Sequence, residues 1–289
     1  MAYAYPAPAG QLPAEVAQLA ATQQLGNYST TFEPSKRLRI VITLAAPAVL
    51  ILIVAAGLAT DPTSGGGAAT TLVIGLIFLA VAAYFAATGP LLNPAARARK
   101  YYFFEQGFVH PTSKGVQVYR FDAVTELTFR IVNMRYYGVS TGTNHLYKLK
   151  FADGRTLKIT HLTVSKPEEF GPALRIAVAN AQTPRYWQAL MAGQTVAFGK
   201  FVLSMGGIAT DSKQGIPWNE VSGVEVYQGH VRIKRAGKWL SFGGADVYRI
   251  PNLTTFLQLV DHLRAHVAGQ QSAQRAAGGD QFSQTQLGM

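Results

Sequence analysis

The chain contains no cysteine, which excludes a disulfide framework, a thiolate metal site and a cysteine nucleophile. Acidic residues are also scarce, because 15 Asp and Glu stand against 26 Lys and Arg for a formal charge of +11. This composition leaves little material for general acid–base catalysis, and neither the phosphate-loop motif GxxxxGK[ST] nor the zinc motif HExxH occurs. We therefore expect no enzyme activity, no metal site and no cofactor.

Charge of either sign is sparse, at 14% of the 289 residues. The basic excess suits an anionic partner, but a soluble nucleic-acid-binding protein would carry more charge, so we expect no nucleic acid partner. Between Ile40 and Ala96 the only charged side chain is Asp61. The two apolar runs Ile40–Thr60 and Thr70–Thr88 are each about long enough to cross a bilayer, which requires roughly 20 residues. They predict a transmembrane helical hairpin.

Positive charge predicts the orientation of this hairpin. Basic residues flank it on both sides, and the connecting loop contains no Lys or Arg. The positive-inside rule then places both termini in the cytoplasm of a two-helix protein of the inner cell membrane. The residues expected to orient the chain are Lys36, Arg37, Arg39, Arg97, Arg99 and Lys100.

After residue 100 the sequence changes from long apolar runs to short segments in which apolar and polar residues alternate. These segments form two successive blocks with the same order. The phrase FDAVTELTF begins at Phe121, and WNEVSGVEV begins at Trp218 with matching residue types. Each block reads as about six or seven short strands followed by one amphipathic helix. Within the repeated strand we expect Val124, Leu127 and Phe129 to face inward, with Val221, Val224 and Val226 in the second copy, and a bulge where the spacing changes.

The whole arrangement resembles a family of uncharacterised bacterial membrane proteins in which a two-helix anchor precedes pleckstrin-homology-like (PH-like) domains. The resemblance covers most of residues 100–267 and is carried by the segments FFEQGFVH, RFDAV, IPWNEV and RIPNLTTFLQLVD. It implies an α+β fold in which two tandem domains each contain a bent antiparallel sheet capped by a C-terminal helix. It implies no activity for particular residues.

Five regions follow from these patterns. Residues 1–35 read as a flexible arm with a short amphipathic helix around Leu12, Val16, Leu19 and Ala20, lying on the membrane or on the second block. The others are the hairpin (36–100), the first PH-like domain (101–190), the second (191–268) and a disordered tail rich in small and amide residues (269–289). Asn252 is the expected N-cap of the last helix.

Basic residues alternate along one expected hairpin in each copy, which makes them the candidate contacts for an anionic surface. Alternation places them on one sheet face, opposite apolar residues. The alternative is that these residues form a solvated outer face whose charges prevent an edge strand from pairing with another chain. The candidates are Lys148, Lys150, Arg155, Lys158, Arg232, Lys234, Arg235 and Lys238. His262 and His266 have the i, i+4 spacing of a metal pair but no further ligand beside them.

These features predict a membrane-anchored cytoplasmic interaction module. Its expected partners are the bilayer and either anionic headgroups or an unidentified protein or peptide. The alternative is an oligomeric scaffold assembled through the hairpin, in which Gly75, Ala80 and Ala83 allow close helix packing as a homo-oligomer. An enzyme of unfamiliar type is the third and least favoured reading.

Overall fold

The structure is a computed structural model that describes residues 12–35, 38–59, 65–88, 99–112, 114–136, 139–211, 213–238 and 240–285. It confirms the expected α+β class, with four antiparallel sheets in the described residues and a long C-terminal helix. The chain forms two compact units. Unit 1 contains residues 1–119 and 159–170, and unit 2 contains residues 120–158 and 171–289.

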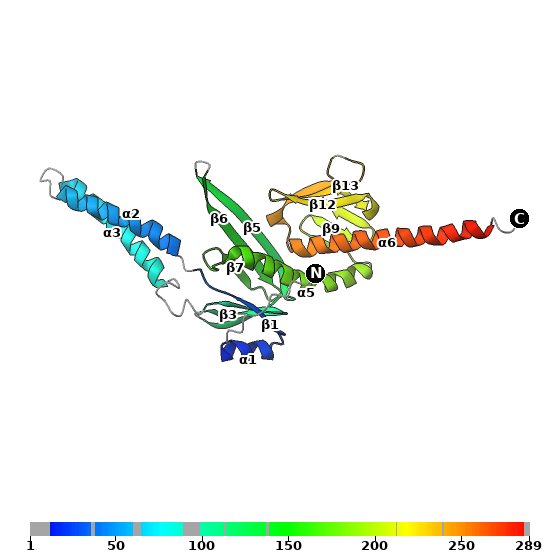
Figure 1. The fold of residues 1–289 in the computed structure, drawn as a ribbon, viewed down its shortest axis with the longest axis horizontal. Helices are drawn as coiled ribbons and strands as arrows, with labels where there is room; N and C mark the ends of the chain where they lie inside the picture. The colour runs from blue at the N-terminus through cyan, green and yellow to red at the C-terminus, as the bar shows by residue number, and fades with distance from the viewer. Residues whose placement is uncertain are drawn as a thin grey trace. The chain divides into compact units, whose positions relative to one another are not determined.

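The first sheet, in unit 1, takes a strand from the segment that the sequence assigned to a flexible arm. Its order is β1 (Tyr28–Phe32), β2 (Tyr101–Phe104), β3 (Gly107–Thr112) and β4 (Gly115–Arg120). The helix α1 (Ala14–Thr22) lies along this sheet (Figure 1). It forms an apolar cluster that joins Val16, Ala20 and Leu25 to Tyr102, Phe104 and Val109. The predicted amphipathic helix is therefore present, and it packs on its own sheet.

The other face of this sheet is aromatic. Phe103 packs edge-on against Phe170 with ring centroids 5.4 Å apart, and Phe32 meets Phe170 at 5.1 Å. The Tyr101 ring stacks on His110 at 4.1 Å. Aromatic pairs of this kind stabilise the fold beyond the burial of their apolar surface. Through them Phe170, at the start of α5, packs as part of unit 1.

Two apolar helices, α2 (Leu38–Ala59) and α3 (Gly65–Thr88), are inserted between the paired strands β1 and β2. Small residues lie between the helices: Ala48, Ala55 and Ala82 are buried, and a Cβ on Gly75 would press on the Leu52 side chain. Large apolar residues such as Leu50, Ile53 and Ile77 are exposed instead. Among the described residues, one helical stretch, Ala69–Thr88, is long and apolar enough to cross a membrane, and α2 holds a shorter one, Ala45–Ala56. A crossing by both helices therefore stays a prediction.

The strand β5 (Val124–Tyr136) pairs with β6 (Val139–Phe151), and β6 pairs with β7 (Thr156–Thr160). A turn at Asp153-Gly154 joins β6 to β7, and Gly154 there has φ +82°. The helix α5 (Pro167–Met191) follows and continues through Gly171-Pro172. At Gly171 the missing Cβ lets the buried Tyr147 ring lie directly against the helix backbone.

The second block repeats a four-stranded sheet, a three-stranded sheet and a helix. One sheet has the order β11 (Lys213–Pro217), β10 (Gly207–Thr210), β9 (Phe201–Ser204) and β8 (Val196–Phe198). The other contains β12 (Val221–Tyr227), β13 (His230–Arg235) and β14 (Gly243–Asp246), with short 3₁₀ turns η1 (Trp218–Glu220) and η2 (Val247–Arg249). The helix α6 (Leu253–Thr285) closes the block.

The strand repeated in both copies behaves largely as expected. Phe121 and Trp218 are buried, as are Val124, Leu127 and Phe129 of the first copy. In the second copy Val221 is buried, but Val224 is only half-buried. Bulges occur between Val124 and Glu126 and between Val221 and Gly223. The inward placement of Val226 was wrong, because this side chain is 47% exposed. It lies near the end of an edge strand, where it lines a surface cleft.

The C-terminal tail differs from the expectation of disorder over residues 269–289, since α6 continues to Thr285. Alanine and glutamine are good helix formers, and extending an existing helix avoids the cost of nucleation. Composition indicated correctly that this segment lacks apolar residues for a core, but a solvated helix needs none.

Candidate functional site

Of the predicted basic residues in the first copy, Lys148 and Lys150 alternate with buried residues along β6 and Lys158 lies on β7, whereas Arg155 lies in the turn before β7. Tyr147, Leu149 and Phe151 are buried on the opposite face. Lys150 forms an ion pair with Glu126 at 2.8 Å, and Arg155 with Asp153 at 2.6 Å. The backbone N–H of Arg155 also holds the pKa of Asp153 below its ordinary value. Half of this set is therefore neutralised locally by the chain's own carboxylates.

The second copy brings all four of its predicted residues to one place. Arg232, Lys234, Arg235 and Lys238 line a surface hollow of about 540 Å³ together with Ser222, Glu225, Leu240 and Ser241, which we call the basic hollow. Lys234 pairs with Glu225 at 3.1 Å, and Arg235 donates from Nε to Glu220 at 2.7 Å. Within the described residues, Arg232 and Lys238 form no ion pair.

An apolar side chain lies among these cations. Leu240 is 68% exposed, although it lines the basic hollow. It follows Lys238 and Trp239 in the sequence, and Trp239 lies outside the described residues. Cations beside an exposed leucine can contact both a phosphate layer and the apolar region beneath it.

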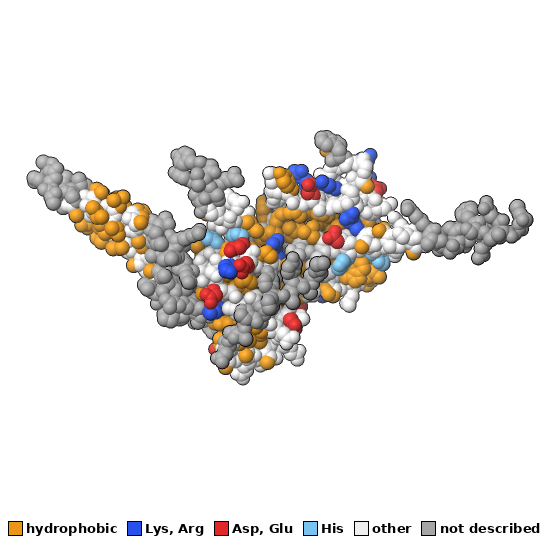
Figure 2. Space-filling model, in the orientation of Figure 1, with side chains coloured by type: hydrophobic (Ala, Val, Ile, Leu, Met, Phe, Trp, Pro, Cys, Tyr) orange, Lys and Arg blue, Asp and Glu red, His pale blue; other side chains and the backbone are white. Residues whose placement is uncertain are grey.

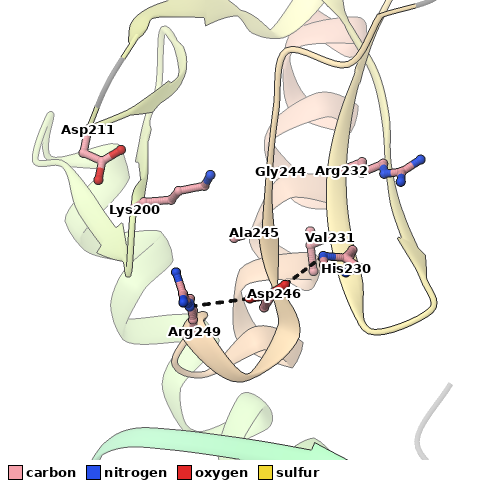
Figure 3. Close-up of a pocket in the computed structure, with 9 residues that line it drawn as sticks. All are labelled: Lys200, Asp211, His230, Val231, Arg232, Gly244, Ala245, Asp246 and Arg249. Carbon is pink, nitrogen blue, oxygen red and sulfur yellow. Dashed lines mark ion pairs between the residues drawn. The ribbon is translucent and has the colours of Figure 1, made fainter.

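A second hollow of about 490 Å³ shares Arg232 with the basic hollow (Figure 3). Lys200 and Arg249 point into it, and Asp246 forms ion pairs with His230 Nδ1 at 2.8 Å and with Arg249 Nε at 3.5 Å. A hydrogen bond to the Tyr248 hydroxyl raises the pKa of Arg249. Sequence reasoning missed these residues because three separate segments bring them together.

The described residues offer little for catalysis. No hydroxyl or thiol side chain lines the hollow around His230 and Asp246 in the described structure. The pentapeptide GVSTG at 138–142 matches the serine motif GxSxG, but Ser140 pairs with Arg135 in an antiparallel ladder. The motif requires a strand-to-helix turn to expose its serine. The absence of enzyme activity stays a prediction.

The histidine pair on α6 does not form a metal centre with further ligands in the described region, where no group of three or more His, Cys, Asp or Glu side chains could hold an ion. His262 and His266 instead each make an edge-to-face contact with the Trp187 ring, with centroids 5.9 and 5.7 Å away. Their spacing on the helix fits an aromatic contact.

The residues expected to orient the membrane segment are only partly described. Lys36, Arg37 and Arg97 lie outside the described residues, and the side chain of Arg39 is likewise not described. Arg99 and Lys100 immediately precede β2. Lys100 pairs with Glu33 at 3.0 Å, which raises the pKa of the lysine. This ion pair joins the two ends of the inserted segment.

Within unit 2, buried hydrogen bonds join the two sequence copies. Gln182 on α5 is 1% exposed, donates from Nε2 to Val124 O at 2.6 Å and accepts from Thr255 Oγ1 at 3.2 Å. Asn252 accepts from Leu127 N and donates to Thr125 O, each at 2.8 Å. The buried polar groups of Gln182 and Asn252 therefore have hydrogen-bond partners within the protein. We interpret this contact between the two sequence copies as structural.

No curated protein matched the chain. The pattern of a family of unknown function, DUF6585, matches residues 1–269, which include the apolar helices, both sheet blocks and the first half of α6. The chain therefore belongs to the DUF6585 family.

Proposed function

We propose that this protein is a membrane-anchored interaction module, in which the apolar hairpin fixes two tandem PH-like domains at the inner membrane and the second domain binds anionic lipid headgroups. Both termini are cytoplasmic in this proposal. The single observation that carries headgroup binding is the basic hollow with its exposed Leu240.

The strand pairing supports anchoring by two helices. Phe32 at the end of β1 pairs with Tyr101 at the start of β2. The chain therefore leaves and re-enters the sheet at one place, so the inserted segment must cross a bilayer an even number of times if it crosses at all. If Ala69–Thr88 crosses, the 22-residue helix α2 must return, and at 1.5 Å per residue it is about 33 Å long.

The packing of the hairpin supports the same arrangement. Small residues inside and large apolar residues outside are the pattern of helices that associate within lipid, where burying apolar surface gives no advantage over contact with acyl chains. In water this exposure would favour aggregation.

The repeated order of a four-stranded sheet, a three-stranded sheet and a helix supports the tandem PH-like interpretation. A bent antiparallel sheet leaves an apolar face that a C-terminal helix can cover. The second block follows this plan with Phe256, Leu259 and Leu263 of α6 fully buried.

Vesicle capture tests headgroup binding. The full chain is held by its hairpin in phosphatidylcholine nanodiscs, so that the hairpin cannot insert into the probe vesicles. We expect capture of vesicles containing phosphatidylglycerol, but not of pure phosphatidylcholine vesicles. Replacing Arg232 and Lys238 by Gln removes two charges worth about 1 kcal/mol each, and should weaken capture by roughly thirtyfold at low salt.

The matched control replaces Lys148 and Lys158 by Gln, which removes the same charge from the first copy. We expect it to reduce capture much less. Equal losses in the two double variants would show a non-specific effect of net charge, and capture independent of lipid charge would refute the proposal.

The scaffold alternative rests on the small residues of α3. Gly75 contacts Leu52 within the hairpin, whereas Ala80 and Ala83 are exposed. Cross-linking of the full chain in detergent distinguishes the two functions, because a monomer that still captures anionic vesicles requires no scaffold.

A further inference from the structure

A surface cleft of about 550 Å³ in unit 2 lies apart from the basic residues of the proposed lipid surface. One wall is β5, and the other comes from β12, η2 and the start of α6. The residues that carry the argument are Phe129, Ile131, Arg175, Val226, Tyr248 and Leu257. Hydrophobic side chains gather over the second sheet block in the space-filling view (Figure 2).

The backbone of β5 has an open edge along this cleft. In its sheet β5 has one neighbour, β6. The outer side of Leu127 is already occupied, because its N–H donates to Asn252 Oδ1 and its carbonyl accepts from Asn252 N at 2.9 Å. Strand groups alternate in direction, and the register is unbroken from Glu126 to Met134.

The N–H and carbonyl groups of Phe129 and Ile131 therefore face the same outer side as those of Leu127. Within the described structure they have no backbone partner beyond β6. Unpaired groups of this kind form a ready template for another strand. Asn252 thus occupies the beginning of this edge and η2 lies against β5, whereas the outward backbone groups of Phe129 and Ile131 have no hydrogen-bond partner among the described residues.

The side chains along the cleft are unusually apolar for an exposed surface. Ile131 is 45% exposed, Val226 47% and Tyr248 44%. The guanidinium of Arg130 lies 5.8 Å from the Tyr248 ring centroid. An extended segment between the walls would cover these groups while its backbone paired with β5.

Arg175 determines the charge of the ligand. Its guanidinium lies 4.4 Å from the Phe129 ring centroid, and its Nε donates a long hydrogen bond to Gly171 O at 3.4 Å. Burial lowers the pKa of this arginine. Neither Arg130 nor Arg175 forms an ion pair among the described residues. A half-buried cation without a carboxylate is costly, and an incoming carboxylate would compensate it.

The charges around the cleft favour an acid over a base. His230 also lines it, and the only lining carboxylate, among the described residues, is Asp246. That carboxylate is already paired with His230 and Arg249. Two arginines, Arg130 and Arg175, therefore line a cleft whose carboxylate, among the described residues, is already paired.

We propose that this cleft binds an extended acidic-apolar peptide from a partner protein. The peptide adds as a strand to β5 at Phe129 and Ile131, places apolar side chains against Val226, Tyr248 and Leu257, and sets a carboxylate on Arg175. This site is separate from the lipid surface, so either proposal can fail without the other.

The test is selection of a seven-residue peptide display library on the full chain in neutral phosphatidylcholine nanodiscs. We expect enrichment of peptides that alternate apolar and acidic residues. Arg175→Gln should weaken their binding by about tenfold or more, the equivalent of one charge-assisted contact. Because Arg175 lacks a counter-ion, this variant should fold without loss of melting temperature.

Backbone pairing has its own readouts. Ile131→Pro removes an outward N–H but leaves the bonds to β6, and should weaken binding, whereas Ile131→Val should not. N-methylation of the peptide at alternate positions should abolish binding, and methylation at the intervening positions should not. The double variant of Arg232 and Lys238 is the control for the lipid surface and should bind peptide normally.

Three results would overturn the proposal: a library with no acidic-apolar enrichment, unchanged binding by folded Arg175→Gln, or tolerance of N-methylation at every position. Displacement of the selected peptides by phosphatidylglycerol vesicles would assign them to the basic hollow instead.

Discussion

Asn252 has a left-handed backbone, with φ +52°, and makes four hydrogen bonds, two through its side chain and two through its backbone. The sequence predicted an N-cap, and α6 does begin at the next residue. The amide side chain, however, bonds to β5, which lies 125 residues earlier. The side chain is buried at 4% exposure, so the sequon NLT at this position offers no accessible acceptor.

Asn252 therefore yields the first prediction. Asn252→Gly keeps the left-handed backbone but leaves Leu127 N without its acceptor, and should lower the free energy of unfolding by about 2 kcal/mol. Asn252→Ala adds backbone strain and should cost roughly 1 kcal/mol more. Urea denaturation of the full chain in detergent measures both values. Equal stability of the wild type and Asn252→Gly would show that the amide bonds contribute nothing.

His110 predicts a dependence on pH. Its Nδ1 lies 3.0 Å from Lys100 O, its ring stacks on Tyr101, and burial lowers its pKa from 6.5. The unfolded chain therefore binds a proton more readily than the folded one, so His110 destabilises the fold as pH falls below 6.5. Above that pH its contribution is constant.

Melting temperature at pH 7.5 and 5.5 tests this sign. His110→Asn, which retains a donor near Nδ1, should lose less stability on acidification than the wild type. His262→Asn on the exposed face of α6 is the control and should follow the wild type. A larger acid loss in His110→Asn than in the wild type would contradict the assignment.

The packing of helix α5 depends on Gly171, because the absence of a side chain there lets α5 pass directly over the buried Tyr147 ring. A Cβ there would overlap the ring, and such overpacking costs about 2 kcal/mol. We expect Gly171→Ala to lower the free energy of unfolding by this amount. Gly269→Ala in α6 is the matched control, because that Cβ meets open space and should stabilise the helix by roughly 0.5–1 kcal/mol.

Urea denaturation with the helical signal of circular dichroism measures both glycine variants. Combining Gly171→Ala with Tyr147→Phe should recover part of the loss, because the hydroxyl is the atom closest to the added methyl group. If Gly171→Ala were as stable as Gly269→Ala, the packing of α5 on β6 would differ from that described.

Across the whole molecule, strand pairing at Phe32 and Tyr101 predicts the topology of the inserted segment. Since the chain has no cysteine, each introduced cysteine is unique. We expect Thr156→Cys and Ser272→Cys to react with an impermeant maleimide from the same side of sealed vesicles. Ser64→Cys, between the apolar helices, should react only from the opposite side. Labelling of all three from one side would show that the hairpin does not cross.

The sequence by itself determined the class of elements and their order. Apolar run length, period-two alternation and the repeat at Phe121 and Trp218 are local properties, and each predicted an element that the structure contains. The sequence also predicted the bulges in the repeated strand and the alternation of Lys148 and Lys150, because these too depend on residues close together in the chain. The strand β1 was missed because YSTTF, at Tyr28–Phe32, carries no apolar alternation, and its partner β2 lies about 70 residues further on.

Only the tertiary structure decided which residues meet. The basic hollow, the hollow around Asp246 and the cleft beside β5 are each assembled from several segments, and their distances in sequence carry no signal of their proximity in space. The same holds for Asn252, whose helix-capping pattern is local but whose actual partners depend on where β5 runs. Side-chain periodicity is set by the backbone's own geometry, whereas contacts between distant segments depend on how complete surfaces pack together.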